Sequence, residues 1–308
     1  MSISKYLREI GRGKDGARPL GREQAADLFG QVLDGAVTDL EVGAFCIAMR
    51  VKGETAQEMA GYLDATYARM HRVPAGALPL VVLPSYNGAR KLPLLTPLLA
   101  LLLAREGLPV LIHGARTEGT RVFISDVLEA LDIAPREQAG PVAAGEIAYL
   151  PTSLLCPGLQ RLLEVRKTIG LRNSSHSLVK LMNPCEGDAV IVGSYTHREY
   201  AVAMGEVYEL MHSTAMLLRG TEGEPVADPR RLRPTEGFVR GERMVLEPGE
   251  DGSVTDMPEL PTELDPLTTA AYVRAAMSGK RPVPAPIARQ VEHILRLARA
   301  SNTKETRP

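Results

Sequence analysis

The pattern that most restricts the fold of this chain is a strand–helix–strand sequence in residues 80–112. The apolar run 80–83 has the character of a buried strand, and the run 108–112 has that of a second one. Between them a helix is predicted, with Thr96 as its N-cap, Pro97 in its first turn and Gly107 just after its end. Strands joined through a helix run parallel, with a right-handed crossover.

Later segments continue the pattern. Strands are predicted at 189–192 and 214–218, and the sequence Thr196-His197-Arg198-Glu199 resembles a capping box that opens a helix extending to about Met211. Short strands and turns are expected over 229–266, followed by helices at 268–277 and 286–300. The predicted fold class is therefore α/β with a mostly parallel central sheet, preceded by a small helical domain.

The helical domain is expected over residues 1–72, and the α/β domain over residues 79–308. Helices are predicted at 3–10 and 22–33, and two capping boxes begin at Thr38 and Thr55, with Glu41 and Glu58 as their carboxylates. The segment 73–79 is rich in Pro, Ala and Gly, as linkers are.

Composition bears mainly on the cellular compartment. The three cysteines (Cys46, Cys156 and Cys185) are far apart, form no metal-binding spacing and are expected to be core residues, which is typical of a reducing cytoplasm. The first fifteen residues do not resemble a signal peptide, and Pro93 and Pro97 interrupt the longest apolar stretch. A cytoplasmic protein without a membrane partner is expected.

Charge is balanced overall but unevenly distributed. The formal net charge is -1, so the whole chain gives no argument for a polyanionic partner. Basic side chains nevertheless gather in the segments 90–121, 161–180 and 230–243. A single cluster of this kind is most often a solvated surface, and we interpret Arg230, Arg231 and Arg233 in the third segment as a surface turn. Two clusters that converge on one cleft could hold a polyanion.

In open α/β sheets, ligands bind at the carboxyl ends of strands, so the loops after the first two predicted strands are candidate binding loops. Each of these loops carries a motif. The loops read Pro84-Ser85-Tyr86-Asn87-Gly88-Ala89-Arg90-Lys91 and His113-Gly114-Ala115-Arg116-Thr117. Together with the segments 156–159, 165–172, 181–184 and 219–223, they resemble in order and spacing the anthranilate phosphoribosyltransferase family, of the nucleoside phosphorylase II fold. The resemblance covers nearly the whole chain.

The departures from that family concern its phosphate site. The enzymes hold phosphoribosyl pyrophosphate on backbone N–H groups of a loop that reads Gly-Thr-Gly-Gly-Asp, whereas Gly88 is the single glycine of this loop and no aspartate follows it. The Lys and Asn of the enzymes' second loop are replaced by Ile112 and Ala115. The acidic pair that holds Mg²⁺ is missing, since Pro225 follows Glu224. Ordinary phosphoribosyl transfer is therefore not expected, and no cofactor or metal is predicted.

The retained features are positively charged. Arg166 matches the family arginine that lies against anthranilate, and Arg90 and Lys91 can hold phosphate without a metal. The sequences of residues 86–91 and 171–174 resemble the YbiB-type branch of the family. That resemblance implies a homodimer, with its contact in the helical domain, that binds DNA or RNA without sequence preference through basic grooves.

The predicted site residues fall into two groups. Those expected to contact nucleic acid are cationic: Arg90, Lys91, Arg116, Arg121, Arg166, Lys167, Arg172 and Lys180. Those expected to line the vestigial cleft are Tyr86, Asn87, Gly88, His113, Gly114 and His176. For the histidines a structural role is the common alternative to phosphate contact. A nucleophile at Ser174 or Ser175 is rejected, because side chains adjacent to His176 do not form a Ser–His dyad.

The expected binding mode is electrostatic. Tyr86 is the sole aromatic residue in these two loops, and a stacking platform normally uses several. With about five to eight phosphates neutralised, the slope of log affinity against log salt is expected to be about -4 to -7. Two alternatives stay open: a transferase or phosphorylase acting on an unidentified ribosyl substrate, and a sensor of small anions or nucleotides that uses the old cleft.

Overall fold

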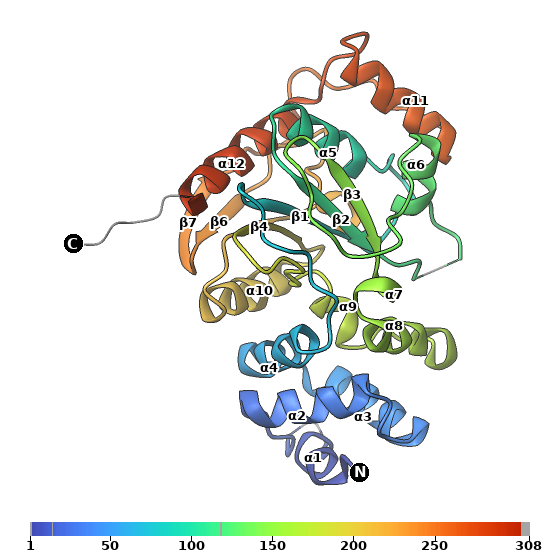
Figure 1. Ribbon diagram of the computed structural model, residues 1–308, viewed down its shortest axis with the longest axis vertical. Helices are drawn as coiled ribbons and strands as arrows, with labels where there is room; N and C mark the ends of the chain where they lie inside the picture. Colours follow the sequence, from blue (N-terminus) through green and yellow to red (C-terminus); the bar gives the residue numbers. More distant parts are fainter. Residues whose placement is uncertain (1, 14, 118, 303–308) are drawn as a thin grey trace, which may run out of the picture.

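The computed structural model describes residues 2–13, 15–117 and 119–302. Figure 1 shows a helical layer at one end of the long axis and a twisted sheet with its covering helices at the other. The helical layer begins with α1 (Ser4–Ile10), α2 (Arg22–Leu33), α3 (Asp39–Lys52) and α4 (Ala56–Tyr67). Both predicted capping boxes are confirmed, because the hydroxyls of Thr38 and Thr55 accept from the backbone N–H groups of Glu41 and Glu58.

An aromatic cluster holds these helices together. The rings of Phe29 and Tyr62 stack with their centroids 4.5 Å apart, and Phe45 meets Tyr62 edge-on at 6.0 Å. All three are fully buried. Such pairs stabilise the packing beyond the free energy of burying their apolar area.

The α/β part contains one seven-stranded sheet in the order β3-β2-β1-β4-β5-β6-β7. The first five strands along the chain are mutually parallel and the last two are antiparallel. The strands are β1 (Leu80–Ser85), β2 (Val110–Gly114), β3 (Ile147–Pro151), β4 (Ala189–Ser194), β5 (Ala215–Leu218), β6 (Thr235–Val239) and β7 (Glu242–Glu247). The predicted fold class, a small helical domain before an α/β domain with a mostly parallel sheet, is confirmed.

Alternate strand residues serve two different cores. On β1, Val81 and Leu83 face one core, whereas Leu80 and Val82 face the other. The first core is closed by α5 (Thr96–Arg105), α6 (Ile124–Ala130), α11 (Pro266–Met277) and α12 (Ala285–Asn302). The second core receives α10 (Arg198–Leu210) and continues into the helical layer. Because one apolar cluster spans both regions, the helical layer is anchored on the sheet.

Three helices from the middle of the chain join the helical layer to the sheet, and α8 lies level with α4 (Figure 1): α7 (Thr152–Leu155), α8 (Pro157–Ile169) and α9 (Ser175–Leu178). A Cβ atom at Gly158 would lie 2.2 Å from the carbonyl oxygen of Leu33, so only glycine allows α8 to approach the end of α2 this closely. The first seventy-two residues therefore do not form the helical layer alone.

Two predicted helix caps are wrong. Residue Leu95 is the N-cap of α5 and Thr96 is already inside the helix, with no side-chain cap. The helix α10 begins at Arg198 without a side-chain cap, so the predicted capping box at Thr196 does not form. All three cysteines are buried and free, as expected for core residues. Within the described part of the chain, no helix is long and apolar enough to cross a membrane.

Candidate functional site

The loops after the parallel strands meet at the carboxyl edge of the sheet, and three of them build the candidate site. We call them the β1 loop (residues 86–91), the β2 loop (residues 115–117 and 119–122) and the β5 loop (residues 219–226), the last of which contains the short 3₁₀ helix η1 (Thr221–Gly223). Residues of β1 and β2 pair along their length as far as Ser85 and Gly114, so these two loops leave the sheet side by side.

The β5 loop places a buried carboxylate on the β1 loop. One oxygen of Glu224 accepts hydrogen bonds from the backbone N–H groups of Asn87 and Gly88, both at 2.7 Å. The other oxygen accepts from the hydroxyl of Ser85. A Cβ atom at Gly223 would lie 2.0 Å from Nδ2 of Asn87, so the close approach of the two loops requires glycine there.

A second carboxylate holds the outer half of the same loop. The two oxygens of Glu222 accept from the backbone N–H groups of Arg90 and Lys91, at 2.6 and 2.8 Å. Residue Glu222 itself has φ +54°, an uncommon left-handed conformation for a residue with a side chain. The carbonyl of Glu222 accepts from Nδ2 of Asn87 at 2.7 Å, which helps to fix that conformation.

Four backbone N–H groups of the β1 loop therefore converge on two carboxylates of the chain itself. Successive N–H groups that point to one side form an anion-binding nest. In this protein the anions are Glu222 and Glu224, which already accept from these four donors. A bound pyrophosphate does not fit this arrangement. In the described ranges, no three His, Cys, Asp or Glu side chains gather as a metal site would.

The buried charges of the site are Glu224 and Lys180. Burial raises the pKa of the Glu224 carboxyl. The hydrogen bonds from Ser85 and the β1 loop and the charge of Lys180 act in the opposite direction and lower that pKa, but burial has the larger effect. Burial lowers the pKa of Lys180 to about 8, while the nearby Glu224 opposes the shift. The ammonium of Lys180 donates to the carbonyl of Gly223 at 2.9 Å. Lys180, predicted as a nucleic-acid contact, is therefore buried with its ammonium on the β5 loop, although the residue also belongs to the lining of a cavity described below.

Two of the predicted cleft residues form a buried polar chain. The hydroxyl of Tyr86 lies 2.7 Å from Nδ1 of His113 and 2.8 Å from Oγ1 of Thr152. Since Thr152 donates to the carbonyl of Gly114, Tyr86 donates to Thr152 and accepts from His113. Burial lowers the pKa of His113 to about 3, so it is neutral at pH 7. His113 is fully buried in this chain, which agrees with the structural role given as the common alternative to phosphate contact.

The exposed cations of the site come from the first two loops. Both Arg90 and Lys91 are exposed, and Nη1 of Arg121 donates to the carbonyl of Asn87 at 3.1 Å. An isolated bridge between Ala89 and Val122 ties the loops together. The guanidinium of Arg116 pairs with Asp126 and lies over the ring of Phe123. The structure thus places Arg121 against the β1 loop that carries Arg90 and Lys91, with Arg116 on the same loop as Arg121.

The other predicted contacts lie elsewhere. Arg166 and Lys167 are in the last turn of α8, where Lys167 pairs with Glu164 at 3.2 Å. Arg172 and His176 line a cavity of about 500 Å³ between the helical layer and the sheet. Of the two arginines near the anthranilate motif, Arg172 and not Arg166 lines this interdomain cavity in the described structure. The predicted cations therefore divide into separate groups.

The interdomain cavity also contains residues that the sequence interpretation missed. Its walls come from α3, α4, the segment around α9, and the start of α10. Three ring-bearing side chains line it in addition to His176, namely Tyr195, His197 and Tyr200. The spacing Tyr195…Tyr200 directly after a predicted strand was the signal that could have found them.

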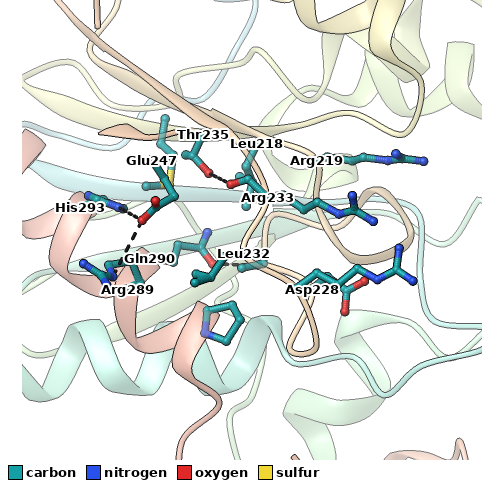
Figure 2. Close-up of a pocket in the computed structure, with 14 residues that line it drawn as sticks. Leu218, Arg219, Asp228, Leu232, Arg233, Thr235, Glu247, Arg289, Gln290 and His293 are labelled. Atoms are coloured by element: carbon teal, nitrogen blue, oxygen red, sulfur yellow. Dashed lines mark hydrogen bonds and ion pairs between the residues drawn. The ribbon is translucent and has the colours of Figure 1, made fainter. Parts of the chain in front are cut away.

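A second cluster of arginines lies at the ends of β5 and β6. Figure 2 shows Arg219 and Arg233 side by side and directed away from Glu247. On the opposite side of that small pocket, Glu247 lies 3.8 Å from Arg289 and 3.6 Å from His293. The turn predicted at 230–233 thus joins Arg219 at the carboxyl edge, a proximity that the chain order does not show.

Comparisons with known proteins agree with this architecture. Residues 4–70 match the model of the glycosyl transferase family helical bundle domain. The chain is 38% identical over 291 residues to the Escherichia coli K12 protein YbiB, covering 92% of this chain and 90% of that protein. It is 29% identical to the anthranilate phosphoribosyltransferase of Methylobacterium nodulans, over 91% of this chain and 84% of the enzyme.

Solved structures share the fold. The anthranilate phosphoribosyltransferase of Thermus thermophilus superposes with a TM-score of 0.69 at 21% identity, covering 96% of this chain and 95% of the enzyme. The Saccharomyces cerevisiae enzyme in complex with phosphoribosyl pyrophosphate and Mg²⁺ gives a TM-score of 0.66 at 15% identity, over 97% of this chain and 94% of the enzyme.

Proposed function

Because this chain belongs to the YbiB branch of the anthranilate phosphoribosyltransferase-like family, we propose that it binds DNA or RNA without sequence preference, through cations at the carboxyl edge of a phosphoribosyltransferase fold. The proposal depends mainly on one observation, which is how Arg90 and Lys91 are held. Their backbone N–H groups are fixed on Glu222, whereas their side chains are exposed. An anchored backbone that presents exposed cations suits a ligand with a repeating negative charge.

The surrounding charges support a phosphate-contacting surface. Arg121 adds a further cation next to Asn87, and Arg230 lies close enough to Glu222 for its pKa to be raised by that charge, after the larger effect of its pair with Asp228. Side chains of this kind contact phosphates and carry no base information. The expected binding is therefore strongly dependent on salt and indifferent to sequence.

A homodimer is part of the proposal. Exposed apolar residues follow one another along α3: Leu40 is 83% exposed, Ile47 43% and Val51 61%. Ile47 and Val51 line an apolar groove of about 420 Å³ together with Leu7 and Ile10 of α1. A contiguous apolar surface on a helix marks a site of association. The α3 face of a second copy of the chain would cover this apolar surface. The resulting dimer would carry two sheets, each with its own cationic carboxyl edge.

The experiment that tests nucleic-acid binding is fluorescence anisotropy with random-sequence DNA and RNA at several salt concentrations. We expect affinity for both, with a slope of log affinity against log salt of about -4 to -7. Absence of binding at low ionic strength would refute the proposal. A strong dependence on sequence would contradict the phosphate-contact mode.

One observation favours a second candidate, a transferase acting on a ribosyl substrate. The interdomain cavity of about 500 Å³ is large enough for a small substrate, and Lys180 and Arg172 line it. Pyrophosphate binding on the β1 loop would require the β5 loop to withdraw, because Glu222 and Glu224 hold the N–H groups. Calorimetry with phosphoribosyl pyrophosphate and Mg²⁺ tests this candidate. A measurable heat of binding would support it.

A further inference from the structure

Three ring-bearing side chains line the interdomain cavity. Tyr195 follows β4 directly, and His197 and Tyr200 lie at the start of α10. The rings of His197 and Tyr200 have centroids 6.3 Å apart, and Tyr200 is 47% exposed. An exposed tyrosine beside a second ring offers a flat apolar surface with little conformational entropy to lose.

The register of the sheet places arginines next to these rings. Ser194 pairs with Leu218, and the backbone N–H of Tyr195 donates to the carbonyl of Leu218 at 3.1 Å, so Tyr195 and Arg219 leave the sheet as neighbours. Leu218 also pairs with Thr235, which brings the end of β5 close to Arg233 (Figure 2).

Charge effects on Tyr195 agree with this placement. Burial and Glu236 raise the pKa of the Tyr195 phenol, whereas Arg219, Arg198 and Arg233 act to lower it. These effects agree with the register of β4 and β5, which places Arg219 beside Tyr195. Arg198 is exposed and begins α10 between His197 and Tyr200 in sequence.

Rings that line a cavity, with arginines at the neighbouring strand ends and at the start of α10, match one class of ligand. In a duplex the bases are paired and stacked, and they cannot enter a cavity at the protein surface without being extruded. An unpaired base can stack on an aromatic ring while its phosphates contact arginines. A cavity of about 500 Å³ has the size of a small-molecule site, which a single nucleotide fits.

We infer that the interdomain cavity accepts an unpaired base of a single-stranded nucleic acid, stacked against Tyr200 and Tyr195, with Arg198, Arg219 and Arg233 contacting the adjoining phosphates. The inference rests on the proposed function and adds to it a preference for single strands over duplexes. It revises the purely electrostatic mode expected from the sequence, because Tyr86, the aromatic residue of the β1 loop, is buried and the rings near the cavity come from another loop.

The test compares a single strand with the duplex of the same sequence, using oligonucleotides that carry 2-aminopurine at one position. Wild-type protein is expected to bind the single strand about tenfold more tightly and to change the fluorescence of the unpaired 2-aminopurine, as stacking on one ring predicts. Tyr200→Leu should lose most of that preference and fluorescence change while leaving duplex affinity unaltered. Tyr200→Phe, which retains the ring, should keep both.

The matched control is Val202→Ala on the same helix, at a residue that is 58% exposed and outside the lining of the cavity. It should behave as wild type. Equal affinity for single strand and duplex, or an unchanged preference in Tyr200→Leu, would overturn the inference and leave the proposed function standing. Failure of the wild type to bind either form would instead refute the proposed function, and this inference with it.

Discussion

The carboxylate of Glu222 accepts a hydrogen bond from the backbone N–H of Lys91 at 2.8 Å. The contact joins loops that are 131 residues apart in sequence, and it is one of four in which a glutamate takes an N–H group of the β1 loop. A carboxylate and a phosphate are alternative acceptors for the same donors. The β1 loop thus keeps the geometry of an anion site while the protein supplies the anions.

Removal of the outer carboxylate should therefore make the nest available to a free anion. We expect calorimetry to show no binding of inorganic pyrophosphate to the wild type, and weak binding, with a dissociation constant on the order of 1 mM, to Glu222→Ala. Glu222→Gln retains an amide oxygen that can accept from Arg90 or Lys91, so it should bind pyrophosphate more weakly than Glu222→Ala. Equal heats for wild type and Glu222→Ala would contradict the role of the carboxylate as the occupant of the nest.

The exposed pair at the end of the β1 loop should carry part of the affinity for nucleic acid. Replacing Arg90 and Lys91 together by Gln should weaken oligonucleotide binding and reduce the slope of log affinity against log salt by about 2, since two phosphate contacts are lost. The free energy of unfolding should change by less than about 0.5 kcal/mol, because both side chains are exposed. Anisotropy at several salt concentrations and thermal melting measure the two effects.

The chain offers a matched control in Lys280 and Arg281, an adjacent exposed pair just beyond α11. The double Gln variant there removes the same formal charge at a place remote from the β1 loop. It should leave the salt slope unchanged. A similar loss of affinity in both double variants would mean that only net charge matters, and it would remove Arg90 and Lys91 from the interface.

The fold could be predicted from local patterns, whereas much of the site could not. The strands, the capping boxes at Thr38 and Thr55 and the carboxyl-edge loops each depend on a few neighbouring residues. The β3 strand and α8 were not predicted, and the segment that forms α8 was interpreted for its basic charge and its family motifs, not for its helical pattern.

The site depends instead on contacts between distant segments. The sequence placed Glu224 in a motif that had lost its metal pair, but it could not show that Glu222 and Glu224 face the β1 loop. Likewise, nothing local distinguishes Lys180, which is buried on the carbonyl of Gly223, from the exposed Lys167. Long-range pairing decides which cations remain at the surface.

The buried state of His113 should make stability depend on pH. Its pKa in the folded protein is about 3, against an ordinary value near 6.5, so between these values the unfolded chain binds a proton that the folded protein excludes. The free energy of unfolding should therefore fall as the pH is lowered from about 6.5 towards 3, by up to about 1.4 kcal/mol per pH unit from this residue. His113→Asn should flatten that part of the profile.

Comparing His113→Asn with the wild type separates the contribution of His113 to the pH dependence of stability from the contribution of Glu224. The raised pKa of Glu224 has the opposite sign, because the folded state then holds a proton that the unfolded chain has released, and it is common to both proteins. Urea unfolding at a series of pH values measures the two profiles. Parallel profiles below pH 6.5 would show that His113 accepts a proton in the folded protein.

The apolar face of α3 should determine the oligomeric state. Burying the side chains of Ile47 and Val51 against a second copy would stabilise a dimer by about 4 kcal/mol in total, which corresponds to about a thousandfold in the dissociation constant. Replacing both residues with Asp removes this free energy of burial and adds a cost for desolvating two charges in each chain. Sedimentation equilibrium should therefore report a single chain. The control is Val245→Asp on β7, a similarly exposed valine at 68%, which should leave the dimer intact. A dimer that persists in the α3 double variant would place the contact on another surface, and a wild type that sediments as one chain would refute the homodimer itself.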